Sequence, residues 1–237
     1  PRLSTVGLQF SAGWNETTDR QKGYFVQRWG APESWDDAIL QGPHLHVATP
    51  LYKQPNPTMK HNQDWSETDF ETLAPDAIPA TSYKPAGPRA RYDADYTHWD
   101  GKPARDEYRL AWRKMAANTG ERTLIAAIVP PGCAHIDGVF CLGVSPQDLA
   151  LVAGGAASLL LDYAVRVAPK ANIRTSVLSR LPLPEPDHPL APALVLRALR
   201  MNSVTNAYSG LWRERWNAQF AEDSWTTDEH VFSTLGD

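Results

Sequence analysis

The sequence has few of the residues that crosslink a chain or anchor it in a membrane. Its two cysteines, Cys133 and Cys141, are too few for a disulfide framework or a four-ligand zinc site. No apolar run approaches the ~18 residues that a bilayer-spanning helix needs, and residues 1–15 lack the basic start and hydrophobic block of a signal peptide. We therefore expect a cytoplasmic protein. The chain begins Pro-Arg-Leu without a methionine, which indicates a segment of a longer polypeptide.

Motifs of self-contained enzymes are missing as well. The only Pro-Pro pair, Pro130-Pro131, follows Val129 and precedes Gly132. It therefore differs from the Asn/Asp-Pro-Pro-aromatic loop with which amino-methyltransferases hold their target amine. The sequence also has no Gly-x-x-x-x-Gly-Lys, no Gly-x-Ser-x-Gly and no His-Glu-x-x-His. We predict that the chain holds no catalytic residue, no cofactor and no metal ion.

Three residue patterns leave weaker alternatives. Asp76 with Asp100 and Lys102 has the loose spacing of a nuclease Mg²⁺ site, but both halves fall in proline-rich loops without a presenting strand. His44 and His46 alternate on a predicted strand over 44–48 and could bind a metal. Without a third ligand nearby, hydrogen bonding is favoured for both. Nine tryptophans and eight tyrosines leave carbohydrate stacking open, although most of them are expected in the core.

Positive charge is concentrated in two short windows, although the net charge is −4. Residues 81–122 carry 9 basic and 6 acidic groups, and residues 160–180 carry 4 basic and 1 acidic. The segment 123–159 between them has no basic residue. If the two windows converge in three dimensions, they form a positive face that could neutralise phosphates. From charge alone, a solvated surface with chance clustering is favoured.

Hydrophobic periodicity predicts a mixed α/β (α+β) fold. Strands are expected over 108–117, 122–129 and 139–144. Ser145 followed by Pro146 predicts a helix start, and that helix continues to Val167. The proline-rich stretch 50–104 predicts long, ordered loops, and two further helices are expected over 190–201 and 203–221. We predict a domain over 1–186 with a small mixed sheet, and a C-terminal helical extension over 187–237.

Several motifs, taken in order, resemble a known family. Their order and spacing are similar to the C-terminal specificity regions of adenine-N6 DNA methyltransferases, of the type IIG restriction–modification kind and of BREX-like and DISARM-like phage-defence methylases. The resemblance is carried by Tyr-Arg-Leu-Ala-Trp-Arg (108–113), Asn-Thr-Gly-Glu-Arg-Thr (118–123), Ala-Ala-Ile-Val-Pro-Pro-Gly (126–132), Ala-Ser-Leu-Leu-Leu-Asp-Tyr-Ala-Val-Arg (157–166) and Leu-Pro-Leu-Pro (181–184). Upstream, Gln-Gly-Pro-His (41–44) and Pro-Leu-Tyr (50–52) also resemble the family. The chain departs from it at Ala157, where asparagine is usual.

The resemblance implies a target-recognition domain without catalytic residues. Its partners would be double-stranded DNA, the catalytic domain of the same polypeptide, which uses S-adenosylmethionine, and other defence-system subunits. The residues predicted to contact DNA are the cations of the two windows: Lys84, Arg89, Arg91, Arg105, Arg109, Arg113, Lys170 and Arg174.

Individual arginines carry separate predictions. Arg89 and Arg91 follow Gly87-Pro88 and are expected to enter a groove from a loop, because the guanidinium fork matches guanine O6 and N7. Arg122 is expected to be a structural ion-pair partner, and Arg166 is expected to pair with Asp162 along a helix. An alternative from another class is a protein-interaction module, in which the proline-rich loops and the acidic C-terminal helices dock other subunits.

Overall fold

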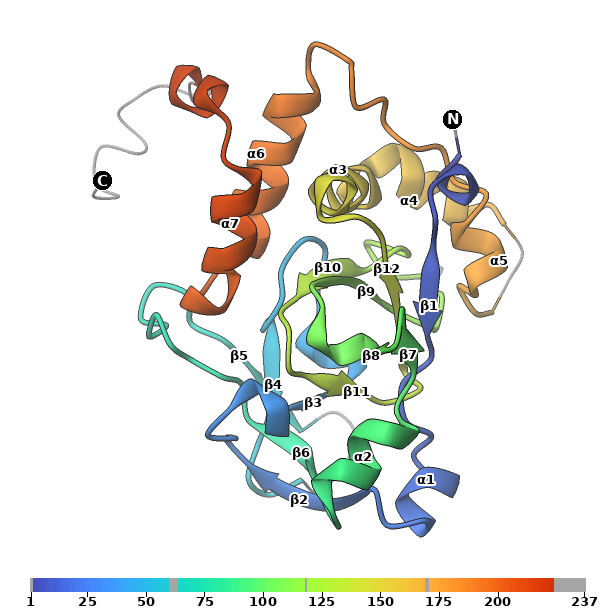
Figure 1. The fold of residues 1–237 in the computed structure, drawn as a ribbon, viewed down its shortest axis with the longest axis vertical. Coiled ribbons are helices and arrows are strands. Elements are labelled where there is room, and N and C mark those ends of the chain that lie inside the picture. The colour runs from blue at the N-terminus through green and yellow to red at the C-terminus, as the bar shows by residue number, and fades with distance from the viewer. Residues whose placement is uncertain (1, 60–63, 118, 169–170, 224–237) are drawn as a thin grey trace.

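A four-stranded antiparallel sheet forms the centre of the molecule (Figure 1). The computed structural model describes residues 2–59, 64–117, 119–168 and 171–223, and they adopt a mixed α/β fold. The predicted strands over 108–117, 122–129 and 139–144 are confirmed as the three adjacent strands β9, β10 and β12. The sheet has the order β1 (Gln9–Ser11), β12 (Val139–Gly143), β9 (Arg109–Arg113), β10 (Ala126–Val129).

Two helices cover one face of this sheet where the sequence predicted one. α3 (Pro146–Ala157) and α4 (Leu159–Arg166) are bent by 67° relative to each other. The bend occurs because Ser158 leaves the helical conformation, and its side chain accepts from the Leu161 N–H, which starts a second helix. Within the described residues no single helix combines the length and apolarity for a bilayer crossing, and only this bent pair meets the criterion when joined.

The C-terminal helices close the open edge of the sheet. Asn202 Oδ1 accepts from the Ile128 N–H at 2.7 Å, and the Tyr208 hydroxyl donates to the Ile128 oxygen at 3.0 Å. Both side chains are fully buried, so the edge strand β10 is covered by side-chain partners where a further strand is lacking. The helix predicted over 190–201 is confirmed, whereas the one predicted over 203–221 is shorter. The helical segments here are α5 (Thr175–Leu178), α6 (Ala191–Asn202), η5 (Asn206–Tyr208), α7 (Ser209–Arg215) and η6 (Ala218–Glu222).

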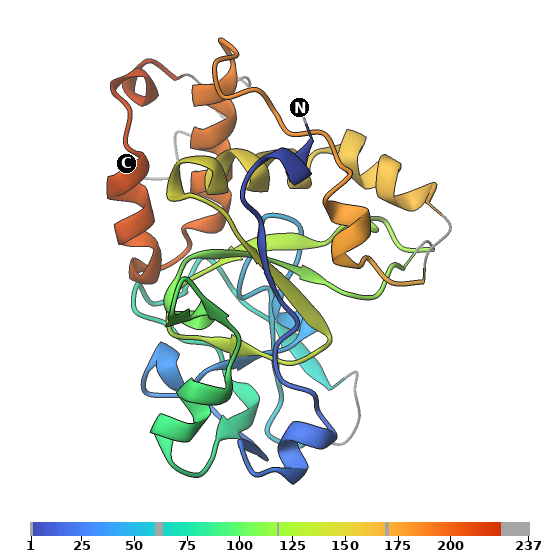
Figure 2. The same cartoon turned by 45° about the vertical axis from the view of Figure 1, so that its right-hand side comes forward.

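The predicted extension beyond residue 186 shares its core with the sheet. Leu196, Leu199 and Leu211 belong to the same buried cluster as Trp112 of β9. Gly154 of α3 allows the close packing of α6, because a Cβ there would lie 2.8 Å from Leu194 Cγ. Figures 1 and 2 show α3, α4, α6 and α7 together on one side of the sheet.

The opposite end of the molecule consists of short elements around an aromatic cluster. Trp14 stacks on Tyr24 at 4.6 Å, and Phe25 and Tyr92 belong to the same buried cluster. The remaining elements are η1 (Leu3–Thr5), α1 (Thr18–Gln21), β2 (Phe25–Gly30), η2 (Trp35–Asp37), β3 (Ile39–Leu40), η3 (Gly42–His44), β4 (Lys53–Pro55), β5 (Trp65–Glu67), β6 (Thr81–Pro85), α2 (Arg89–Asp95), β7 (His98–Trp99), β8 (Lys102–Pro103), η4 (Ala104–Asp106) and β11 (Ala134–His135).

The strand predicted over 44–48 is wrong. Residues 42–44 form the 3-10 helix η3, because Pro43 occupies its first turn and His44 Nδ1 accepts from the Gln41 N–H at 2.9 Å. His44 is fully buried, and its Nε2 lies 3.0 Å from the Ala80 oxygen. The histidine therefore fastens a loop, as the hydrogen-bonding alternative expected.

Candidate nucleic-acid interface

Two of the predicted DNA-contacting arginines, Arg105 and Arg109, are buried, and a third, Arg113, is half-buried. Arg109 on β9 is fully buried, and its Nη2 donates to the Cys133 oxygen at 2.6 Å. Its Nε donates to the Glu107 oxygen at 3.1 Å. The guanidinium therefore holds the Pro130–Cys133 turn against the sheet. The prediction that Arg109 contacts DNA is wrong, because the side chain has no surface to offer.

Arg113, at the other end of β9, holds a second loop. Its Nε donates to the Gly42 oxygen at 2.9 Å, and its Nη2 donates to the Leu45 oxygen at 2.5 Å. Burial lowers the pKa of this guanidinium. Arg113 is half-buried and its donors are directed at main-chain oxygens of the protein, which favours a structural role, while the DNA contact stays a prediction.

Arg105 joins three segments. It is 5% exposed, forms ion pairs with Asp93 at 2.6 Å and Asp36 at 3.1 Å, and donates to the Gly132 oxygen at 2.6 Å. Two carboxylates and one carbonyl thus surround the guanidinium. This residue is a structural crosslink, and the prediction that it contacts phosphates is wrong.

Two further motifs meet at Asp162 on α4. Its carboxylate accepts from the N–H groups of Thr123 and Leu124, each at 2.7 Å. It also pairs with Arg122 at 3.4 Å and with Arg166 at 3.7 Å. The predicted helical pair with Arg166 and the structural role of Arg122 are both confirmed.

The departure at Ala157 does not disturb this network. Arg122 Nη2 donates to the Ala157 carbonyl oxygen at 2.8 Å, a contact that is independent of the side chain at this position. Arg109 and Arg113 link the motifs 41–44, 108–113 and 126–132. Asp162 and Arg122 link the end of the motif 118–123 to the motif 157–166. The residues that carry the family resemblance build the scaffold of the domain.

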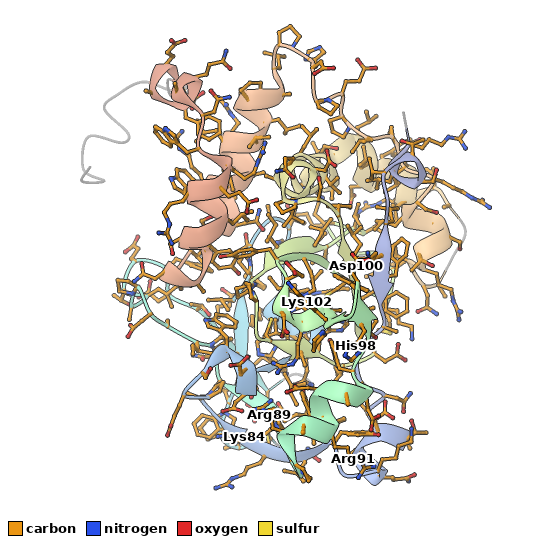
Figure 3. The ribbon with its side chains drawn as sticks, viewed as in Figure 1. Lys84, Arg89, Arg91, His98, Asp100 and Lys102 are labelled. Carbon is orange, nitrogen blue, oxygen red and sulfur yellow. The ribbon has the colours of Figure 1, made fainter. Side chains whose placement is uncertain are left out.

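Three of the predicted cations lie near one another at the end of the molecule opposite to α3 and α6 (Figure 3). Lys84 is on β6, and Arg89 and Arg91 are on α2. The loop predicted for Arg89 and Arg91 is a helix, which begins after Pro88. The first N–H groups of a helix have no hydrogen-bond partner within the helix, so a proline, which lacks this group, costs nothing there. Pro88 therefore favours the start of α2.

The two α2 arginines already have acidic partners. Arg89 forms an ion pair with Asp37 and donates to the Asp36 oxygen at 2.9 Å. Arg91 Nε lies 3.7 Å from Asp95, and its guanidinium lies 4.8 Å from the centre of the Tyr24 ring. Their side chains are 40% and 55% exposed, so they remain accessible to phosphates with part of their charge offset.

Lys84 has no acidic partner among the described residues, and sequence reasoning missed a second such cation beside it. Arg28 lies on β2, which pairs with β6, and it is exposed without an ion pair within the described part of the chain. The charge windows began at residue 81 and overlooked it. Arg28 stands apart from other basic residues in a short strand of mixed composition, so the sequence held no clear signal for it. We call the residues Arg28, Lys84, Arg89 and Arg91 the basic end.

The second basic window lies elsewhere. Arg174 precedes α5, which packs beside α4 on the far side of the sheet from α2 and β6 (Figures 1 and 2). Lys170 lies outside the described residues. The expected convergence of the two windows into one positive face is therefore wrong for Arg174.

The alternatives with metals find no support in the described residues, where no group of three or more His, Cys, Asp and Glu side chains could hold an ion. Asp100 and Lys102 line a cavity of about 660 Å³ next to the β7–β8 turn, and Asp76 is not among its lining residues. Asp100 accepts from Gln9 Nε2 at 2.7 Å.

No protein-family model and no curated protein matches the chain.

Proposed function

We propose that the chain is the non-catalytic DNA-recognition part of a larger S-adenosylmethionine-dependent adenine-N6 DNA methyltransferase. The observation that carries the proposal is the basic end, where the exposed Arg28 and the half-buried Lys84 lie on paired strands without an acidic partner among the described residues. The order and spacing of the motifs support it, and the arginine and carboxylate contacts of these motifs stabilise the domain that carries this end. In the parent enzyme, the catalytic domain would supply the methyl donor and the pocket for the target base.

Duplex DNA suits the basic end for electrostatic reasons. Each neutralised phosphate releases a condensed counterion, so the logarithm of the binding constant falls with the logarithm of salt concentration by about 0.9 per contact. The net charge of −4 does not oppose this, because the field near a surface depends on the local arrangement of charge. Arg89 and Arg91 stay partly exposed on α2 although Asp37 and Asp95 form ion pairs with them.

A salt titration of duplex binding tests the proposal. Fluorescence anisotropy with a labelled duplex should give a binding constant that falls steeply with salt. Lys84→Ala should lower the slope by about 0.9, since it removes one phosphate contact. Arg180→Ala is the control, because Arg180 is an exposed cation that follows α5 on the other side of the sheet. Equal slopes for the wild type and the Lys84 variant, or no duplex binding at all, would refute the proposal.

A protein-binding function is the second candidate, favoured by one observation. The outer side of α4 exposes Leu159, Leu160, Tyr163 and Val167, although the opposite side of the helix is buried. Exposed apolar residues that lie together indicate a contact surface. The occupant implied by the resemblance is the catalytic domain of the parent enzyme. Leu160→Asp should release that domain in a co-purification assay while leaving duplex binding intact.

A further inference from the structure

The β2–β6 ribbon has an exposed surface of unusual composition. The four residues that follow Phe25 on β2 are all exposed, whereas Phe25 itself is fully buried. Val26 lies opposite Lys84 in the antiparallel register, and Gln27 lies opposite Tyr83. Phe25 therefore packs in the aromatic cluster, while Val26, Gln27 and Arg28 are exposed to solvent.

A β-bulge lies at the point where Arg28 is found. The register changes between Gln27 and Gly30, so that two residues of β2 face Ser82 of β6. Bulges twist a strand and redirect its side chains, and they are common beside functional sites. The Lys84 side chain reaches this point of the ribbon, because its ammonium lies 3.1 Å from where a Cβ of Gly30 would stand.

The free edge of the ribbon is accessible. In the described part of the chain, β2 pairs only with β6, and Figures 1 and 2 both place β2 at the outer rim of the molecule. A two-stranded ribbon, with strands about 4.8 Å apart, fits the major groove, which is about 12 Å wide. The element is thus of the right size and sits at the right place to enter a groove.

The chemistry of the exposed residues matches base edges. Arginine reads guanine O6 and N7 with two hydrogen bonds, glutamine reads adenine N6 and N7, and a branched apolar side chain contacts the thymine methyl group. Arg89 and Arg91 are less suited to this role, because they already form ion pairs with Asp37 and Asp95. Arg28 has no such competitor among the described residues.

We propose that the β2–β6 ribbon enters the major groove of duplex DNA, with Arg28 as a base-reading residue, Val26 and Gln27 beside it and Lys84 on a flanking phosphate. This proposal rests on the proposed function and adds to it the reading element and the groove. It assigns α2, with Arg89 and Arg91, to the phosphate backbone next to the ribbon.

Selection from a duplex pool with randomised base pairs tests the assignment. The chain should enrich a defined motif that contains a G·C pair. Arg28→Ala should reduce the preference at that pair roughly 5- to 150-fold, the range for one good two-bond contact. Arg28→Lys should lose it too, although the charge is kept, because lysine lacks the guanidinium fork. Arg180→Ala should leave the motif unchanged.

Each other outcome overturns a defined part. If the wild type enriches a motif and Arg28→Ala enriches the same motif with the same preferences, the ribbon does not read the bases, although the chain still recognises DNA. If the wild type binds duplex DNA with a steep salt slope but enriches no motif, base reading by the ribbon falls. If it binds no duplex, both proposals fall. A dimer by light scattering that Gln27→Pro abolishes would show that another strand occupies the free edge of β2, and would also overturn the assignment.

Discussion

The Asp162 carboxylate on α4 accepts a hydrogen bond from the Leu124 N–H at 2.7 Å, in a site where Asp162 is 4% exposed. This contact joins the second helix to the segment that leads into β10. Because Thr123, Arg122 and Arg166 share the same carboxylate, the anion compensates two guanidinium groups and two amides at once.

Removal of this carboxylate should be costly. Asp162→Leu removes the carboxylate and leaves buried donors without an acceptor, so we expect a loss of about 3–5 kcal/mol in the free energy of unfolding. Asp162→Asn should cost less, because its oxygen can still accept from the two amides. Urea denaturation of both variants measures the difference. A loss below about 1 kcal/mol for the leucine variant would contradict this account.

The closure of the β10 edge gives a second prediction. Asn202→Leu leaves the buried Ile128 N–H without an acceptor, which should lower the free energy of unfolding by about 1–3 kcal/mol. Tyr208→Phe removes the donor to the Ile128 oxygen and should cost about 1 kcal/mol. Both values come from urea unfolding. A double variant that is no less stable than either single variant would argue against this edge contact.

A close approach of Gly143 and Trp99 gives a third. A Cβ at position 143 would lie 2.4 Å from Trp99 Cζ3, so Gly143→Ala should displace the indole ring at a cost of about 1–3 kcal/mol. Tryptophan fluorescence and thermal unfolding can follow the change. In a Trp99→Leu background, Gly143→Ala should cause little further loss of stability. If the two substitutions lower the free energy of unfolding in a fully additive way, the contact is refuted.

Two buried histidines predict a loss of stability in acid. Burial lowers the pKa of His44 to about 4 and that of His135 to about 3. Below pH 6.5 the unfolded chain binds protons that the folded chain excludes, so the free energy of unfolding should fall from about pH 6.5 down to these values. Each histidine contributes up to about 1.4 kcal/mol per pH unit.

The histidine contribution can be isolated by substitution. His135→Gln should flatten the dependence of the unfolding free energy on pH between about 6.5 and 4. Unfolding in urea at several pH values in this interval gives the slope for both proteins. An identical slope in the variant would mean that His135 titrates normally in the folded protein.

The acidic partners on the basic end provide a fifth prediction. Asp37→Asn together with Asp95→Asn releases Arg89 and Arg91 from their ion pairs. If the two guanidinium groups contact phosphates, duplex affinity should rise and its salt dependence should steepen. Anisotropy titrations at several salt concentrations measure both. Weaker binding would show that the ion pairs position the arginines for the contact.

The sequence predicted the central sheet well, because long apolar runs such as 124–129 have few alternatives to a buried strand. It misplaced the break between α3 and α4, since Ser158 is unremarkable until its hydroxyl is seen to start a new helix. The strand over 44–48 failed for a related reason. Alternation in five residues cannot outweigh a proline and a histidine that close a turn locally.

The candidate site was harder to predict than the fold. Counting charge along the chain grouped Arg105, Arg109 and Arg113 with Lys84, although the first three bind the inside of the protein. The density of charge along the sequence does not show which side of a strand a residue occupies, or whether a carbonyl oxygen lies within hydrogen-bond distance of its side chain. Arg28 was missed for the opposite reason, because it stands alone in the sequence and becomes a neighbour of Lys84 only through strand pairing.

The internal arginines have a consequence for how such a domain can diversify. Arg109 and Arg113 donate hydrogen bonds to main-chain carbonyl oxygens, and every residue has a carbonyl group. The side chains of the turns that accept these hydrogen bonds can therefore be substituted while the hydrogen bonds remain. The residues that these turns expose, and any binding specificity that they confer, can therefore change during evolution while the fold stays the same.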